Sequence, residues 1–326
     1  MKTSTTNTLF WLVKREFWEH RGGLFWAPVI TGGVFLLLGI MAIITAEVLG
    51  AHAGINFGAS GLVRNVIDHM DAGDTSQIGG LLDMALYAAL SMTMVVMGFV
   101  VFFYCLGALY DDRRDRSILF WKSLPISDSA TVLSKVVSAA VLAPLIATVA
   151  GILVGVLLLL MLAVTLSFHG VNVWQILILA HPFRVTFNVI GYIPVYLLWA
   201  LPTIGWLMLC SAWARGKPFL WALALPVATG LLITWFGIMG LFNLSSSWFW
   251  INIVLRGLFS AFPGTSILWN GGHVSMGHVP GQPGLDLMNI DQTYALLATP
   301  DLWIGVIVGL GLLAGAVWFR RWRDDS

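Results

Sequence analysis

The stretch VLSKVVSAAVLAPLIATVAGILVGVLLLLMLAVTLSF, residues 132–168, carries a single charged side chain, that of Lys135. Apolar residues occupy both parities of this stretch, which fits a membrane-spanning helix and not the alternating strands of a large β-barrel. Such a helix would extend for about 55 Å, well beyond the ~30 Å hydrocarbon core of a bilayer. We therefore expect it to tilt, to bend near Pro144 or to project into the cytoplasm.

The whole chain shares this apolar character. Of its 326 residues, 58% are hydrophobic and 10% are charged, and its mean hydropathy is +0.87. Soluble globular chains carry about 25% charged residues, and a chain this apolar with a net charge of +1 cannot stay solvated as a disordered chain. The balance of 17 basic against 16 acidic residues gives no basic field for nucleic acid. The predicted fold class is all-α, in a polytopic membrane protein.

Five further stretches are long enough to span a membrane, which takes about 20 residues. The first of the six is too long for the apolar core of a cleavable signal peptide, so we expect it to be retained. The sequence thus predicts one membrane domain, residues 25–326, with spans at residues 25–49, 81–110, 132–168, 187–212, 219–242 and 302–319.

Basic residues are distributed unevenly about these spans. If both termini lie on one side, fourteen Lys and Arg residues fall on that side and three on the other, which is the asymmetry of cytoplasmic and outer loops. Both termini are therefore predicted to be cytoplasmic. The fourteen are Lys2, Lys14, Arg15, Arg21, Arg113, Arg114, Arg116, Lys122, Lys135, Arg215, Lys217, Arg320, Arg321 and Arg323, and the three are Arg64, Arg184 and Arg256.

The segment before the first span, residues 1–24, is predicted to form an amphipathic interface helix on the inner membrane surface. Apolar side chains fall on one stripe, charged side chains fill the remaining faces, and two Trp residues suit the headgroup level. Gly22 and Gly23 would end the helix. The alternative is an orientation anchor with no partner. The stripe comprises Leu9, Phe10, Val13 and Phe17, the charged residues are Lys14, Arg15, Glu16, Glu19 and Arg21, and the tryptophans are Trp11 and Trp18.

The connection between the second and third spans, LYDDRRDRSILFWKSLPISDSATVLSK at residues 109–135, surrounds an apolar patch with charges. A short helix at about 113–124 would place apolar side chains beside arginines, which suits docking into a groove on a partner protein. Pro125 would stop this helix, and Ser127 or Asp128 could cap the next. The alternative is a helix half-buried in the inner leaflet. The predicted docking residues are Arg113, Arg114, Arg116, Ile118, Trp121 and Leu124.

No nucleotide-binding motif accompanies this connection. The Gly216-Lys217 pair is followed by Pro218 and lacks the preceding glycine of a P-loop, whose backbone amides hold phosphate. The cytoplasmic segments are too short for a soluble catalytic domain. We therefore predict that the chain is not an enzyme, that it holds no catalytic, cofactor or metal site, and that any use of ATP comes from another chain.

The sequence resembles the permease subunits of ABC-2-type transporters, which are the six-span membrane subunits of ATP-binding cassette exporters. The resemblance covers the whole chain in layout. It is most specific in LVKREFWEHRG, residues 12–22, and in residues 109–135, where a charged run precedes a short helix, a Leu-Pro-Ile-Ser turn and Lys135. It implies that the tail helix lies on an ATP-binding subunit and that the helix at about 113–124 is a coupling helix seated in a cleft of that subunit.

The resemblance further implies two permeases, as a homodimer or with a related permease, and two ATPase subunits, which would bind ATP and Mg, in the bacterial cytoplasmic (inner) membrane. ATP binding would close the ATPases and move the coupling helices, so that the pathway switches from one side to the other. The alternative from another class is a membrane anchor or sensor that docks a cytoplasmic partner without transport.

The connection between the fifth and sixth spans begins with SSSWFWINIVLRGLFSAFPG, residues 245–264. With Arg256 near its middle, this apolar segment is too short and too charged for a seventh span. We expect an interfacial or re-entrant helix, which a membrane tolerates only where protein buries its backbone ends. Members of the resembled family often carry a re-entrant segment here.

Two loop patterns have a functional and an ordinary interpretation. His273 and His278, with Asp286 and Asp291 downstream, could ligate zinc or copper, although a solvated loop is the simpler interpretation. Ser60, within the sequence GASG, matches an intramembrane serine protease motif, but no predicted span supplies the His that must take its proton.

The spans themselves carry glycine pairs, two acidic residues near outer ends and two cysteines near inner ends. The glycine spacing allows close helix approach, which could serve dimerisation or arise by chance. The acidic residues could act in gating or lie at a wet interface, and the cysteines are expected to be reduced and structural. These residues are Gly151 and Gly155, Gly305 and Gly309, Gly311 and Gly315, Glu47 and Asp83, and Cys105 and Cys210.

Overall fold

A computed structural model describes residues 5–52, 72–115, 126–168, 180–240, 245–268 and 290–322. Within these ranges every regular element is a helix and none is a strand, which confirms the all-α prediction. Six helices are long and apolar enough to cross a membrane, as predicted. They run Gly22–Leu49, Leu82–Arg114, Asp128–Phe168, Pro182–Trp213, Pro218–Ile238 and Pro300–Trp322.

The spans and the helices around them have well-defined bounds. The helices that make up the spans, two of which extend beyond them, are α2 (Ala27–His52), α4 (Ala72–Ala108), α5 (Tyr110–Arg114), α7 (Asp128–Val137), α8 (Ala143–Phe168), α10 (Pro182–Trp213), α11 (Pro218–Ile238) and α16 (Pro300–Trp322). Outside them lie α1 (Thr5–Glu19), α12 (Ser246–Phe249), α13 (Arg256–Phe259), α14 (Thr265–Leu268) and α15 (Ile290–Ala295). Wider π-helical turns occupy Gly22–Trp26, Ser138–Leu142 and Trp250–Leu255, and a 3₁₀ turn occupies Leu296–Ala298.

The third span is interrupted where the sequence predicted a bend. The π-helical turn Ser138–Leu142 joins α7 to α8 directly before Pro144. Proline has no N–H to donate, and its ring crowds the carbonyl four residues earlier, so a wider turn at this point relieves the conflict. The helix therefore continues through the proline with a local change of hydrogen-bond register.

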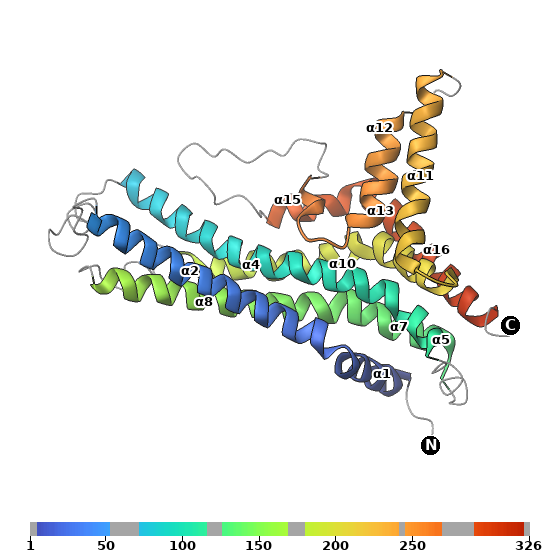
Figure 1. Ribbon diagram of the computed structural model, residues 1–326, viewed down its shortest axis with the longest axis horizontal. Helices are drawn as coiled ribbons and strands as arrows, with labels where there is room; N and C mark the ends of the chain where they lie inside the picture. Colours follow the sequence, from blue (N-terminus) through green and yellow to red (C-terminus); the bar gives the residue numbers. More distant parts are fainter. Residues whose placement is uncertain are drawn as a thin grey trace.

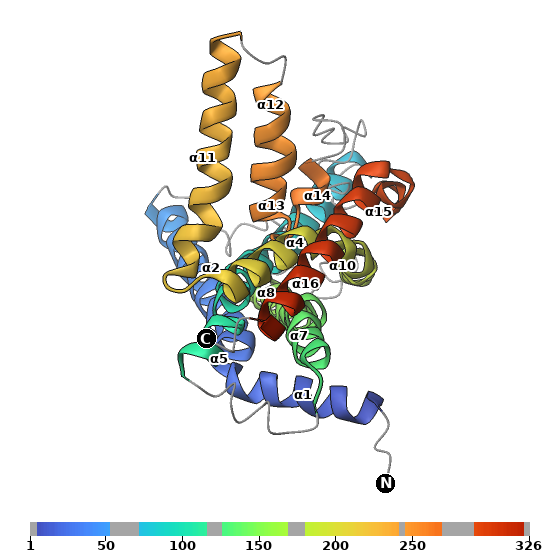
Figure 2. The same ribbon diagram turned by 90° about the vertical axis from the view of Figure 1, so that its right-hand side faces the viewer.

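Most spans form one row of packed helices. Helices α2, α4 and α8 run side by side, α10 lies against α4, and α16 packs along α10 (Figure 1). In both views α11 and α12 stand side by side and point away from this row (Figure 2). Both termini lie at one end of the row, next to α1, α5, α7 and the last turn of α16 (Figure 1). We call this the basal end, and the opposite end, where α2 and α8 end and α4 begins, the distal end.

Glycines bring the long helices close together. A Cβ atom added to Gly151 on α8 would lie 2.8 Å from the Leu90 side chain on α4, and one added to Gly309 on α16 would lie 2.7 Å from the backbone of Leu201 on α10. Close approach of this kind supplies the van der Waals contact that holds helices together in lipid. The faces of two of the predicted glycine pairs are filled within the chain, which leaves no room there for a second copy, whereas a Cβ atom at Gly311 of the third pair would meet nothing within 4 Å. The pairs concerned are Gly151 with Gly155 and Gly305 with Gly309.

The main apolar core lies between α4, α7, α10 and the end of α16. Cys105 and Cys210 are buried in this core and are both free, as expected of reduced structural cysteines. By contrast, α2 and α11 expose large apolar side chains such as Leu38 and Trp235. Such surfaces suit helices that face lipid.

The predicted helix after the fifth span is present. It runs through α12, the π-helical turn and α13 without a break, and Ser245 caps its start. The helix packs against α11, where Trp250 lies over Gly230 and donates a hydrogen bond of 2.9 Å to Thr234. Its placement as a re-entrant helix in a membrane stays a prediction.

Candidate functional site

Glu16 lies on the face of α1 that packs against the row of helices. Its side chain is fully buried at 0% exposure, Leu12 one turn earlier is also buried, and Phe17 packs on the core. The sequence predicts Glu16 on a charged face of the helix, beside the apolar stripe, whereas in the structure Glu16 is part of the buried face. Phe10 is 63% exposed and Val13 is half-buried, so the buried stripe is centred on Leu12 and Glu16.

Lys135 of α7 is the cation that Glu16 meets. Its Nζ atom lies 3.1 Å from Glu16 Oε1 and 3.4 Å from Asp112 Oδ2, and the residue is 1% exposed. Ser127 accepts a hydrogen bond of 3.2 Å from the Ala130 N–H and so caps α7, as predicted. The cap fixes where α7 begins, and two turns later Lys135 reaches α1.

Arg320, in the last turn of α16, extends these contacts to the C-terminal helix. Its Nη1 atom lies 3.2 Å from Asp112 Oδ2, and its Nε atom lies 3.2 Å from Asp128 Oδ1. Arg320 is buried, a position that its place among the basic residues at the end of the last span does not predict. Its two ion pairs join segments that are far apart in the sequence.

Six side chains of alternating sign form a continuous chain of ion pairs, which we call the ion network. Each neighbouring pair is separated by 3.4 Å or less, and the formal charges of these six cancel; the exposed Glu19 also pairs with Arg15, at 3.2 Å. Burying an ion is unfavourable by several kcal/mol unless opposite charges and hydrogen bonds compensate it. The ion network therefore ties α1, α5, α7 and α16 into one block at the basal end. In order, its members are Arg15, Glu16, Lys135, Asp112, Arg320 and Asp128.

Two further side chains donate hydrogen bonds to the carboxylate of Glu16. Tyr104 of α4 donates a hydrogen bond of 2.9 Å to Glu16 Oε2, and Arg15 Nη2 donates one of 2.9 Å to Oε1. Glu16, Glu19 and His20 each offer an atom within 4.8 Å of the others, which is close enough to hold a metal ion. Both oxygens of Glu16 already accept hydrogen bonds, so the geometry favours a structural carboxylate over a metal ligand.

The segment that leads from α4 to the predicted coupling helix is held to α10 by hydrogen bonds. The Ser211 hydroxyl on α10 accepts hydrogen bonds from the N–H groups of Leu109 and Tyr110, at 3.0 and 2.9 Å. Arg113 donates a hydrogen bond of 3.0 Å to the carbonyl oxygen of Ala214, and the cation complements the carbonyl end of α10. The start of the charged connection is thus held to α10.

Two of the predicted docking residues, Arg113 and Arg114, belong to the described part of the chain. Arg113 is bound to α10, and Arg114 is exposed at the basal end. On α1, the exposed Lys14 places its Nζ atom 4.8 Å from the centre of the Trp11 ring, as a cation–π contact. The remaining docking residues lie outside the described residues, and their contact with a partner stays a prediction. They are Arg116, Ile118, Trp121 and Leu124.

At the distal end, Asp83 of α4 is fully buried, which corrects the interpretation that it lies at a wet interface. Asp83 Oδ1 accepts a hydrogen bond of 2.8 Å from the His181 N–H, and Oδ2 lies 3.1 Å from His181 Nδ1. His181 is the N-cap residue of α10, so the carboxylate meets the positive end of the helix dipole. The pair fixes α10 to α4. Glu47, by contrast, is only half-buried.

The two loop hypotheses fall largely outside the described residues. Ser60 lies in the gap at 53–71, and His273, His278 and Asp286 lie in the gap at 269–289. The backbone of Asp291 belongs to α15, but its side chain is outside the described part. The protease and metal interpretations therefore stay predictions.

The described helices define a multi-pass membrane protein, and four of its buried charged residues, Glu16, Asp112, Lys135 and Arg320, lie together at the basal end. A comparison with protein-family models, with curated proteins and with solved structures finds no match for this chain. The proposed function below therefore rests on the sequence and on the geometry of this chain.

Proposed function

We propose that this chain is the membrane-spanning permease subunit of an ATP-binding cassette exporter. The observation that carries the proposal is the ion network at the basal end. Asp112, which pairs with both Lys135 and Arg320, lies four residues before Arg116, where the predicted coupling helix continues. A force on that helix would reach α1, α7 and α16 through buried ion pairs that cannot separate without leaving a charge unpaired.

This arrangement suits a chain that responds to a partner. A separate ATPase, which binds ATP and Mg, would dock at the exposed Arg114 and the predicted apolar patch around Trp121. Two copies of the ATPase would act on two copies of this chain, and their closure would shift the pair between two arrangements. The basal end would lie in the cytoplasm of a bacterium, since the basic residues of the chain gather on that side of the predicted topology.

Site-directed photo-crosslinking in native membranes tests the proposal. A photoreactive amino acid replaces Trp121 in the full chain, and the control replaces Phe187, an exposed residue in the distal half of α10. We expect a light-dependent adduct with an ATP-hydrolysing subunit at position 121 and not at position 187. No adduct with such a subunit, or equal adducts at both positions, would contradict the proposal.

The ATP-hydrolysing subunit identified in this way, reconstituted in liposomes with the chain without crosslinking, distinguishes a transporter from an anchor. Trp121→Ala and Arg114→Ala should each lower the ATP hydrolysis rate severalfold, whereas Arg215→Ala, at an exposed arginine, should not. An ATPase rate that is independent of this chain would favour the membrane-anchor alternative.

A further inference from the structure

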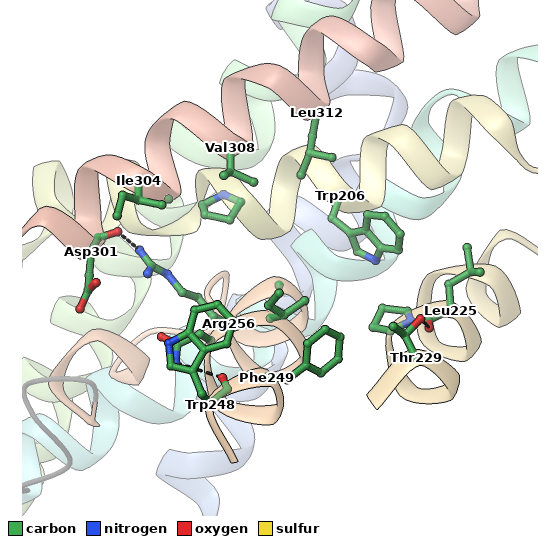
Figure 3. A pocket seen from close by; sticks show the side chains of 16 residues that line it. Trp206, Leu225, Thr229, Trp248, Phe249, Arg256, Asp301, Ile304, Val308 and Leu312 are labelled. Atoms are coloured by element: carbon green, nitrogen blue, oxygen red, sulfur yellow. Dashed lines mark hydrogen bonds between the residues drawn. The ribbon is translucent and has the colours of Figure 1, made fainter. Parts of the chain in front are cut away.

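A cavity of about 730 Å³ lies between α10, α11, the α12–α13 segment and α16 (Figure 3). Sites for small molecules have volumes of about 300–1,000 Å³, so this cavity has the size of a ligand site. Its walls are almost entirely apolar and come from all four elements. They include Trp206, Trp248, Phe249, Ile304, Val308 and Leu312.

One wall of the cavity carries a buried cation. Arg256 is 8% exposed, donates a hydrogen bond to the main-chain oxygen of Asp301 and lies 4.6 Å from the centre of the Trp199 ring. Among the described residues it forms no ion pair, and its Nε atom has no hydrogen-bond partner. Figure 3 shows the carboxylate of Asp301 directed away from the guanidinium group, toward which only its main-chain oxygen points.

The space around this guanidinium group depends on Gly305. A Cβ atom at position 305 would collide with Arg256 Nη2, so the absence of a side chain leaves room for the cation beside α16. An arginine stays charged in proteins, and a buried charge that forms no ion pair is unfavourable. The Asp301 carboxylate lies near enough to attract Arg256 but does not form an ion pair with it, so it compensates the charge only in part. The position of Arg256 is therefore one that an anion would stabilise.

We infer that this cavity binds an amphiphile with a hydrocarbon body and one phosphate or carboxylate group. The anion would pair with Arg256, whose planar guanidinium group matches the two oxygens of either group. The hydrocarbon would lie against Trp206, Ile304 and Val308. The inference goes beyond the proposed function, because the site exists in this chain whether or not an ATPase drives it.

Binding to the delipidated full chain in detergent, followed by native mass spectrometry, tests the inference. The ligands are dioleoyl phosphatidylglycerol, oleate and, as the uncharged control, dioleoylglycerol. We expect one anionic amphiphile per chain and at least about tenfold weaker binding of dioleoylglycerol. Retention of phosphatidylglycerol alone would identify a bilayer phospholipid as the source, and retention of oleate alone would identify a fatty carboxylate.

Two variants locate the site. Arg256→Gln removes the charge, and Val308→Trp keeps the charge but fills the cavity, so it carries the test if the first variant fails to fold. Each should weaken binding of the anionic amphiphile at least about tenfold, whereas Arg184→Gln, at an exposed arginine, should not. Undiminished binding by Val308→Trp, or equal binding of dioleoylglycerol and the anionic amphiphiles, would overturn the inference.

Discussion

Two buried arginines lie at opposite ends of α16, and they differ in whether their charge is paired. Arg320 in its last turn is paired with Asp112 and Asp128, whereas Arg256 beside its first turn contacts the main-chain oxygen of Asp301 and an indole ring. Residues 301 and 320 are about 29 Å apart along the helix. Burial alone therefore does not define the role of a charge. Paired charges hold the basal end together, whereas Arg256, which forms no ion pair within the described part of the chain, lies in the proposed ligand site.

The largest effect should follow from breaking the ion network at its centre. Lys135→Met leaves Glu16 and Asp112 buried without their shared cation, so the free energy of unfolding should fall by about 3–5 kcal/mol. Denaturant unfolding in detergent micelles measures the change. The control Lys217→Met, at an exposed lysine, should stay within about 0.5 kcal/mol. Equal losses in the two variants would show that burial of Lys135 does not matter.

Two acidic residues on α1 compare a buried ion pair with an exposed one. Glu16→Gln removes the charge that faces Lys135, so we expect a loss of about 1.5–3 kcal/mol and faster hydrogen exchange along α1. Glu19, whose side chain is 54% exposed, forms only an exposed pair with Arg15, so Glu19→Gln should change stability by less than about 1 kcal/mol. Unchanged protection of α1 from hydrogen exchange in Glu16→Gln would show that the Glu16 charge does not hold α1 in place.

The middle of α16 connects the two regions and depends on packing rather than charge. Gly309→Ala would push a methyl group into the backbone of Leu201, with an expected loss of about 1–3 kcal/mol. Gly311→Ala is a matched control, because a Cβ atom at that position meets nothing within 4 Å. Thermal unfolding of both variants provides the measurement. A lower melting temperature for Gly311→Ala than for Gly309→Ala would contradict the packing described.

The smallest effect should come from the unpaired cation. Arg256→Met loses a cation–π contact with Trp199 but also removes the unfavourable burial of a charge, so stability should change by less than about 1 kcal/mol. The same unfolding assay as for Lys135→Met gives a direct comparison. A loss as large as that of Lys135→Met would mean that Arg256 is as well compensated as the ion network.

The spans were predictable because a long apolar stretch is a local property of the sequence. The predicted fourth span, residues 187–212, falls within α10, and the main differences lie at helix ends, where α10 begins five residues earlier at Pro182. Capping of α7 by Ser127 was also predictable, since it needs only neighbouring residues. These features follow from propensity and capping chemistry.

The ion network was not predictable from local patterns. Its members come from four helices, and Arg320 meets Asp112 from 208 positions away, so their pairing depends on how the helices pack. One signal was present in the sequence: Lys135 is the single charge in a 37-residue apolar stretch, and a charge there needs a partner. That signal indicates a buried ion pair but does not identify Glu16 as the partner.

A double-mutant cycle between Glu16 and Lys135 tests most directly the claim that the basal end is one electrostatic unit. The free energies of unfolding of the wild type, Glu16→Gln, Lys135→Met and the double variant are compared. Because each single change leaves the other group buried without its partner, the double variant should lose less than the sum of the single losses, with a coupling of about 1–3 kcal/mol. Additive losses would contradict the ion network as the element that joins α1 to α7.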